Sequence, residues 1–180
     1  MAKGSEFERW FCRQLSLWWT GGKSDSTFWR TSNSGGRATV RGKKGKRTKN
    51  HYGDVMAVEP EGQPFIDAVT VELKRGYNRV TIQDLLDKPK GAAKQEWEKW
   101  IKQAQKSAKD AGSESWLLVV KRDRRESLAC YPADSSFPFV MTGAACIILQ
   151  LEDPDETDGE LEVLIQPLRS VLDGMVPWGW

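Results

Sequence analysis

Alternation of apolar and charged residues in one short segment restricts the fold of this chain more than any other feature. Val69, Val71 and Leu73 occupy every second position, and Glu72 and Lys74 are interleaved with them. Because successive side chains of a strand point to opposite faces of a sheet, the segment predicts a strand with one buried, apolar face. The opposite face then carries a carboxylate and an ammonium group side by side.

A turn-forming segment precedes this strand. Residues 59–64 read Glu-Pro-Glu-Gly-Gln-Pro, and we expect strands over 54–58 and 65–73 on either side of them. A hairpin centred in this turn places Asp54 opposite Glu72 on the neighbouring strand. The hairpin therefore predicts that the two carboxylates meet.

One predicted helix precedes the hairpin and a second follows it. The first begins near Ser5 and ends by Gly21, and the second follows Gly91 and ends at Gly112, because apolar residues recur at helical spacing within these limits. This order of elements predicts an α/β fold, a mixed sheet with helices on its faces. Five tryptophans of the two helices are expected in the core: Trp10, Trp18, Trp19, Trp97 and Trp100. Further strands are expected over 116–120, 127–131, 145–151 and 161–165, followed by a short helix.

Composition excludes several classes of protein. The chain has 180 residues, 39% apolar and 29% charged, which suits one globular domain with its own core. No apolar run reaches the roughly 20 residues that span a bilayer, and the charged N-terminus is unlike a signal peptide. We therefore expect a soluble, cytoplasmic protein without membrane contact. Three widely spaced cysteines and one histidine fit neither a disulfide framework nor a zinc site, so a metal site would use oxygen ligands.

Charge is distributed unevenly along the chain, although the net charge is only +2. No acidic residue lies between Asp25 and Asp54, whereas 152–162 holds seven acidic residues and no basic one. Residues 31–50 are rich in Gly, Ser, Lys and Arg, which predicts a long loop or a basic hairpin. Such a segment suits the phosphates of DNA, and a solvated loop that only aids solubility is the alternative. The interval between Asp25 and Asp54 contains these basic residues: Arg30, Arg37, Arg41, Lys43, Lys44, Lys46, Arg47 and Lys49.

The predicted meeting of two carboxylates points to a metal. Two such charges about 4 Å apart repel by about 4 kcal/mol at an effective dielectric of about 20, and a cation between them removes this cost. Mg²⁺ takes one or two carboxylates together with waters and phosphate oxygens, and the Leu73 carbonyl is a further oxygen ligand. Lys74 then lies where it can hold a water molecule or stabilise charge on a phosphate. The alternative is a surface ion pair of Glu72 and Lys74 worth at most about 1 kcal/mol. Asp67 is an odd number of positions from Glu72, so on the same strand it would point to the opposite face.

Asp54 followed by Glu72-Leu73-Lys74 resembles the signature of the PD-(D/E)XK nuclease superfamily, an acid on one strand and then Glu-x-Lys on the next. Gly53 stands where that family has a proline. Residues 4–9, Gly-Ser-Glu-Phe-Glu-Arg, resemble the first-helix motif of archaeal Holliday junction resolvases and related phage and prophage endonucleases. In that motif a glutamate assists metal binding, and Glu8 is the matching position, with Glu6 as the competing one.

The resemblance extends beyond these motifs and covers about residues 4–120. Arg30 and Ser34 are similar to an Arg and a Ser in the loop after the first helix of those resolvases, and Gln103 and Gln105 lie near a position where the superfamily sometimes adds a polar residue. It implies a restriction-endonuclease-like core in the order α-β-β-β-α-β within one nuclease domain spanning 1–180. A β-rich extension then occupies 121–180.

In function, the resemblance implies an endonuclease that hydrolyses DNA phosphodiester bonds with Mg²⁺, for which Mn²⁺ substitutes. Asp54, Glu72, the Leu73 carbonyl and Glu8 bind the metal, and Lys74 completes the catalytic set. Arg30, Ser34 and the basic segment bind DNA, and branched DNA and recombination intermediates are candidate substrates. A homodimer and the cytoplasm of a bacterium or a phage-infected cell are further expectations. The alternative is a non-catalytic DNA- or RNA-binding module that uses the basic residues of 37–49 for affinity.

Overall fold

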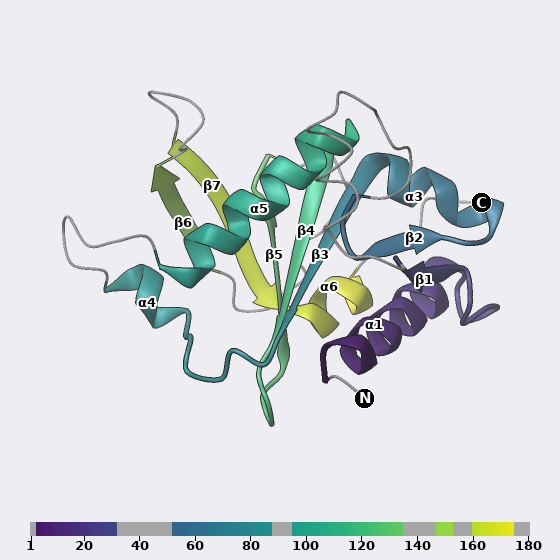
Figure 1. Cartoon of the computed structure of the whole chain (residues 1–180), viewed down its shortest axis with the longest axis horizontal. Coiled ribbons are helices and arrows are strands. Elements are labelled where there is room, and N and C mark those ends of the chain that lie inside the picture. The colour runs from purple at the N-terminus through teal and green to yellow at the C-terminus, as the bar shows by residue number, and fades with distance from the viewer. Residues whose placement is uncertain (1–2, 32–51, 88–94, 135–146, 153–159, 175–180) are drawn as a thin grey trace.

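The computed structural model describes residues 3–31, 52–87, 95–134, 147–152 and 160–174 (Figure 1). The chain begins with a long helix, passes through a short two-stranded ribbon and then builds a sheet around a second long helix. In chain order the elements are α1 (Lys3–Trp19), β1 (Phe28–Arg30), β2 (Val55–Ala57), η1 (Pro60–Gly62), α3 (Gln63–Ala68), β3 (Val69–Arg75), α4 (Gln83–Leu86), α5 (Glu96–Ala111), β4 (Ser115–Lys121), β5 (Ser127–Pro132), β6 (Ile147–Glu152), β7 (Glu160–Pro167) and α6 (Leu168–Gly174).

Five strands form one mixed sheet in the order β3-β4-β5-β7-β6. β3 runs parallel to β4, and every other neighbouring pair is antiparallel. A parallel pair needs a crossover connection, which α5 supplies. β3 lies at one edge of the sheet, so its outer backbone groups face away from β4. The expectation of an α/β fold with a mixed central sheet is confirmed.

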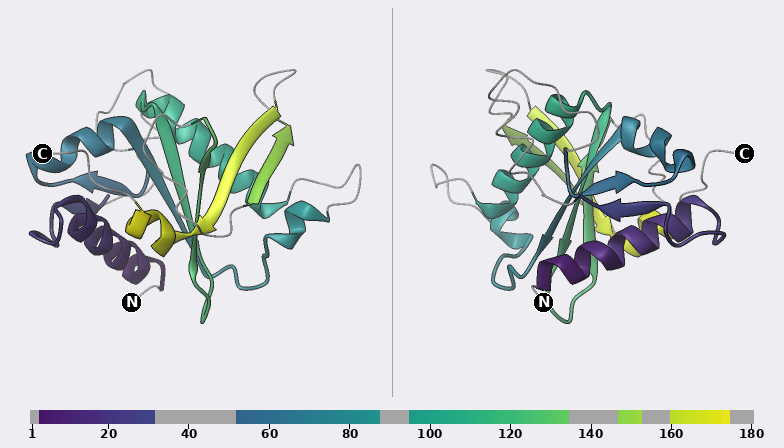
Figure 2. Two further views of the ribbon diagram at one scale, coloured as in Figure 1. Left: turned by 180° about the vertical axis from the view of Figure 1, so that it is seen from behind. Right: turned by 45° about the vertical axis from the view of Figure 1, so that its right-hand side comes forward.

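Helices cover both faces of the sheet. α5 packs on one face through Trp97, Trp100 and Ile101, whereas α1 and α6 pack on the other through residues such as Phe11 and Val171. Figure 1 shows α5 in front of the sheet, and the left view of Figure 2 shows α1 and α6 on the opposite side. Val69, Val71 and Leu73 of β3 belong to the apolar layer that α1 and α6 cover, as the alternation in the sequence predicts. The face of β3 that carries Glu72 and Lys74 lies toward α5.

The predicted hairpin is wrong. Residues 65–68 belong to α3, and β2 pairs with β1 instead of β3, with Arg30 opposite Val55. Pro60 and Pro64 each lie in the first turn of a helix, a position that proline suits because its missing N–H has no helical acceptor there. The prolines that predicted a turn thus begin two short helices. The prediction that Asp67 lies on the opposite face of the strand from Glu72 is also wrong, because Asp67 belongs to α3.

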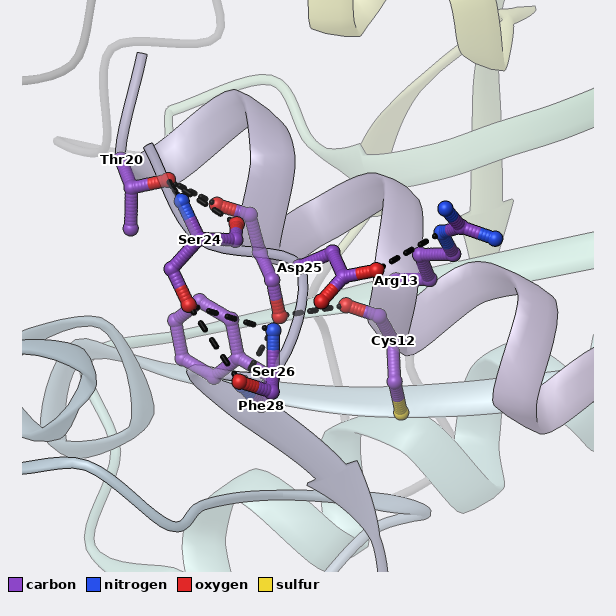
Figure 3. A network of polar contacts seen from close by, with 8 residues as sticks. Cys12, Arg13, Thr20, Ser24, Asp25, Ser26 and Phe28 are labelled. Atoms are coloured by element: carbon purple, nitrogen blue, oxygen red, sulfur yellow. Dashed lines mark hydrogen bonds and ion pairs between the residues drawn. The ribbon is translucent and has the colours of Figure 1, made fainter. Parts of the chain in front are cut away.

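Hydrogen bonds fix β1 against α1 (Figure 3). The Ser16 hydroxyl donates to the Cys12 carbonyl at 2.8 Å and accepts from the Phe28 backbone N–H at 2.9 Å. The Thr20 hydroxyl accepts from the Ser24 N–H at 2.9 Å and donates to the Ser24 carbonyl at 3.0 Å. The helix and the strand are therefore held as one unit, and this unit brings the end of β1 toward the edge of β3.

Most of the other predicted elements are present. α1, α5, β4, β5, β6, β7 and α6 match the expected helices and strands to within a few residues, and Gly112 ends α5 with φ +77°. The prediction for Trp10 is wrong, since 44% of this residue is exposed, and Trp18 is only half-buried. Within the described ranges, no helix combines the length and the apolar character needed to cross a membrane.

Candidate active site

Asp54 lies against the outer edge of β3. Its backbone N–H donates to the Val71 carbonyl at 2.8 Å, and its Oδ2 accepts from the Leu73 backbone N–H at 2.8 Å. Only 8% of the residue is exposed. Asp54 therefore reaches the strand that carries Glu72 through a loop that crosses the sheet edge, without the hairpin that the sequence predicts.

Gly53 makes this approach possible. Its φ is +75°, and a Cβ at this position would lie 2.5 Å from the Val71 carbonyl oxygen. A proline cannot take this conformation because its ring fixes φ near −65°. Thr31, the residue after β1, holds the same loop, since its hydroxyl donates to the Gly53 carbonyl at 3.0 Å and its N–H donates to the Asp54 carbonyl at 3.0 Å. Glycine therefore suits this position for a steric reason, and proline does not.

Glu72 and Lys74 lie on the face of β3 that α5 covers. Glu72 is only 4% exposed. Its carboxylate accepts hydrogen bonds from the Ser107 hydroxyl at 2.7 Å and from Gln103 Nε2 at 3.0 Å. Lys74 Nζ lies 3.7 Å from Glu72 Oε2 and donates to Gln103 Oε1 at 2.8 Å. One turn of α5 therefore orients both charged groups through Gln103 and Ser107.

Of these two helix residues, the sequence pointed to Gln103, together with Gln105, and missed Ser107. Ser107 lies four residues after Gln103 and so shares its helix face. That spacing is the signal in the sequence that could have found it, once Gln103 was assigned to the site.

Negative charge accumulates around Asp54. Burial raises the pKa of its carboxyl from the usual 3.8 to about 7, and the charges of Glu72 and Glu8 act in the same direction. The Leu73 N–H and Lys74 oppose this shift without cancelling it. Burial raises the pKa of Glu72 as well. Two buried carboxylates at one strand edge thus lack sufficient positive charge, which is the condition that a bound cation relieves.

The donors at this edge are oxygen atoms. Within a strand the N–H and C=O of one residue point to the same side, so the Leu73 carbonyl faces the edge where its N–H meets Asp54. In the described ranges, no group of three His, Cys, Asp or Glu side chains is arranged to hold a metal. Two carboxylates and a backbone carbonyl fit Mg²⁺, which binds few protein ligands and keeps several waters.

Glu8 projects from α1 toward the same region. Its Oε2 lies 3.1 Å from Arg30 Nη1 at the end of β1, and its charge raises the pKa of Asp54 and of Cys12. Glu6 is exposed and lies 3.9 Å from Arg75. Between the two glutamates of this helix turn, Glu8 is the one whose charge acts on Asp54. Arg30, predicted to bind DNA, pairs with this carboxylate.

The other predicted DNA-binding residues lie in 32–51, outside the described residues. They are Ser34, Arg37, Arg41, Lys43, Lys44, Lys46, Arg47 and Lys49.

Comparison with known proteins identifies a family for most of the chain. A family model described as "Phage putative PDDEXK endonuclease" matches residues 1–153. A search of curated proteins and a search of solved structures each found no match. The matched range includes all the residues that contact one another at the edge of β3.

Proposed function

The chain belongs to the family of phage PDDEXK endonucleases, and from this membership we propose that it is a Mg²⁺-dependent endonuclease that hydrolyses DNA phosphodiester bonds at the outer edge of β3. One observation carries the proposal: Asp54 and Glu72 are both buried, and the charges of Glu72 and Lys74 act on the Asp54 carboxyl at this edge. A charged site of this kind is costly to fold and is typical of catalytic centres.

Asp54, Glu72 and the Leu73 carbonyl would hold the metal, with Mn²⁺ as a substitute. When bound, such an ion lowers the pKa of a water molecule and balances the charge that develops on the phosphate. Glu8 supports the site, directly or through a water molecule. Its ion pair with Arg30 at 3.1 Å keeps the carboxylate pointed toward the region of Asp54.

Lys74 acts on the reacting groups. Its ammonium group donates to the attacking water or to a phosphate oxygen, and Gln103, at 2.8 Å, sets its direction. Ser107 and Gln103 hold the two oxygens of Glu72 at 2.7 and 3.0 Å, so this carboxylate keeps one orientation. α5 is therefore a positioning element for the carboxylate and the ammonium group together.

DNA binding is assigned to the basic segment, and Arg30 and Ser34 contribute at its start. The seven basic residues from Arg37 to Lys49 would neutralise up to seven phosphates, which gives a log-log salt slope of about −6. Branched DNA is the first substrate class to test, because residues 4–9 resemble the first helix of the archaeal resolvases. A homodimer would allow both strands to be cut.

A cleavage assay tests the proposal. Wild-type protein should cut DNA with Mg²⁺ or Mn²⁺ and stop in EDTA, whereas Asp54→Asn and Lys74→Ala should lose at least about 100-fold in rate. Asp173→Asn, an exposed carboxylate of α6, is the matched control and should cut normally. Equal cutting by wild type, Asp54→Asn and Lys74→Ala would contradict the assignment. DNA binding without any metal-dependent cleavage would favour the non-catalytic module.

A further inference from the structure

A hollow of about 460 Å³ lies beside the candidate site and is not part of it. It is formed by α3, the first residues of β3, the turn after α5, and Tyr52. Figures 1 and 2 show α3 and the C-terminal end of α5 on either side of the start of β3. The hollow therefore opens at the end of β3 that precedes Glu72.

Its position relative to the reacting groups is fixed by the chain. Thr70, in its wall, precedes Glu72 by two residues of the same strand, and Tyr52 precedes Asp54 by two residues. At about 3.3 Å per strand residue, the backbone of Thr70 lies about 7 Å along β3 from that of Glu72. A nucleotide that flanks a phosphate held at the carboxylates is therefore close to the hollow.

The lining selects the kind of group that enters. Among the described lining residues none is Lys or Arg, and Asp67, which is exposed, places a carboxylate at the rim. This charge repels a phosphate, so the hollow suits a neutral group. Tyr52 offers an aromatic ring, and Ile66 and Val69 add an apolar wall. Bases stack on aromatic side chains whatever their sequence.

Asp67 also supplies a means of reading a base. Gln63 Nε2 donates to its Oδ1 at 2.7 Å, which orients the carboxylate. A carboxylate has lone pairs for more than one donor, and it accepts from the amino group of a base such as cytosine. Thr70 and Ser113 also line the hollow, and their hydroxyls share a hydrogen bond of 2.8 Å. Tyr52 thus offers a ring for stacking, and Asp67 offers an oriented hydrogen-bond acceptor.

We propose that this hollow is a base subsite that takes one unpaired nucleobase next to the cleaved phosphodiester bond. The inference rests on the proposed endonuclease function and names its substrate class, DNA with an unpaired nucleotide at the cleavage point. A base inside an intact duplex must first be unpaired and unstacked before it enters such a pocket, whereas an unpaired base need not be. Tyr52 stacks on the base, and Asp67 selects among bases by their donor groups.

Cleavage of matched oligonucleotides tests the subsite. The substrates are a fully paired duplex, the same duplex with a single-stranded flap, and flap substrates with one abasic residue moved through the positions around the cut. The wild type should prefer the flap, and an abasic residue at one position should lower kcat/KM by about tenfold. Tyr52→Ala should lower kcat/KM on the intact flap equally and make that abasic residue harmless, whereas Tyr52→Phe should retain wild-type behaviour.

Base selection is read with the same flap substrates. Asp67→Asn should change the order of preference among the four bases at the sensitive position, because an amide donates as well as accepts. Asp173→Asn, which removes a carboxylate from a separate hollow beside α6, should leave that order unchanged. The subsite is overturned if the paired duplex is cut as fast as the flap, or if neither abasic residues nor Tyr52→Ala alter cleavage.

Binding in EDTA separates this proposal from the endonuclease assignment. A single-stranded oligonucleotide with one 2-aminopurine should show quenched fluorescence when bound, and Tyr52→Ala should restore the fluorescence while Asp54→Asn should not. Quenching of this kind without cleavage of any DNA would overturn the endonuclease assignment and support the subsite. Cleavage without Tyr52-dependent quenching would support the endonuclease and overturn the subsite.

Discussion

Removing the charge of Asp54 should stabilise the metal-free protein at neutral and alkaline pH. The carboxyl has a pKa of about 7 in the folded chain instead of the usual 3.8, because it is buried and lies near Glu72. Between these two pH values the folded state binds more protons than the unfolded state. The free energy of unfolding therefore falls as pH rises through this window and becomes constant above it.

The size of this effect follows from the pKa. Each pH unit inside the window changes stability by at most about 1.4 kcal/mol, so the interval from pH 5 to pH 7 is worth at most about 3 kcal/mol. For a chain of this length that corresponds to a decrease in Tm of about 5 to 10 °C. The raised pKa of Glu72 acts in the same direction. Asp54→Asn removes the part due to Asp54 and keeps an oxygen that accepts from the Leu73 N–H.

Thermal unfolding in EDTA at pH 5, 6, 7 and 8 measures this. The Tm of the wild type should fall from pH 5 to pH 8. The Tm of Asp54→Asn should fall less and should be higher than that of the wild type at pH 8. The Tm of Asp173→Asn should follow that of the wild type. Adding Mg²⁺ at pH 8 should raise the Tm of wild type by mass action and leave Asp54→Asn nearly unchanged. A wild-type Tm that stays level or rises from pH 5 to pH 8, or a parallel slope in Asp54→Asn, would refute the reasoning.

Three further outcomes are expected. Gly53→Ala should lower the free energy of unfolding, measured with urea, by at least about 1 kcal/mol more than Gly76→Ala, because both glycines have positive φ but only a Cβ at 53 meets the Val71 carbonyl; equal losses would contradict this. Ser107→Ala should lower kcat about tenfold with little change in KM, and a change in KM alone would argue against a positioning role. Cys12 should resist iodoacetamide at pH 8 in the native protein, since burial raises its pKa to about 12; rapid labelling in peptide maps would show otherwise.

The sequence predicted those parts of the site that depend on local pattern. The alternation around Glu72 and Lys74 has a period of two residues, as the two faces of a strand require, so the sequence alone predicts that they share a face. The sequence does not show which strand pairs with β2, because this pairing joins segments that are distant along the chain. Pro60 and Pro64 read equally well as turn residues and as helix starts, and this ambiguity led to the wrong hairpin.

Contacts made by side chains across elements were harder to predict. Ser107 follows Glu72 by 35 positions along the chain and reaches it from α5. The sequence around Ser107 shows only a helical pattern. Trp10 follows the same apolar spacing as buried residues of α1, yet it lies at the border of the apolar stripe and is exposed. Periodicity gives the direction of a side chain but not the width of the surface that covers it.

The loop at the edge of β3 has a consequence for solubility as well as for chemistry. An edge strand presents unpaired N–H and C=O groups that invite another chain to add a strand. Here Asp54 occupies two of them, the Val71 carbonyl with its backbone and the Leu73 N–H with its side chain. The acid assigned to bond cleavage thus also blocks strand addition, so a change that displaces this loop exposes a surface for self-association at the same time as it removes activity.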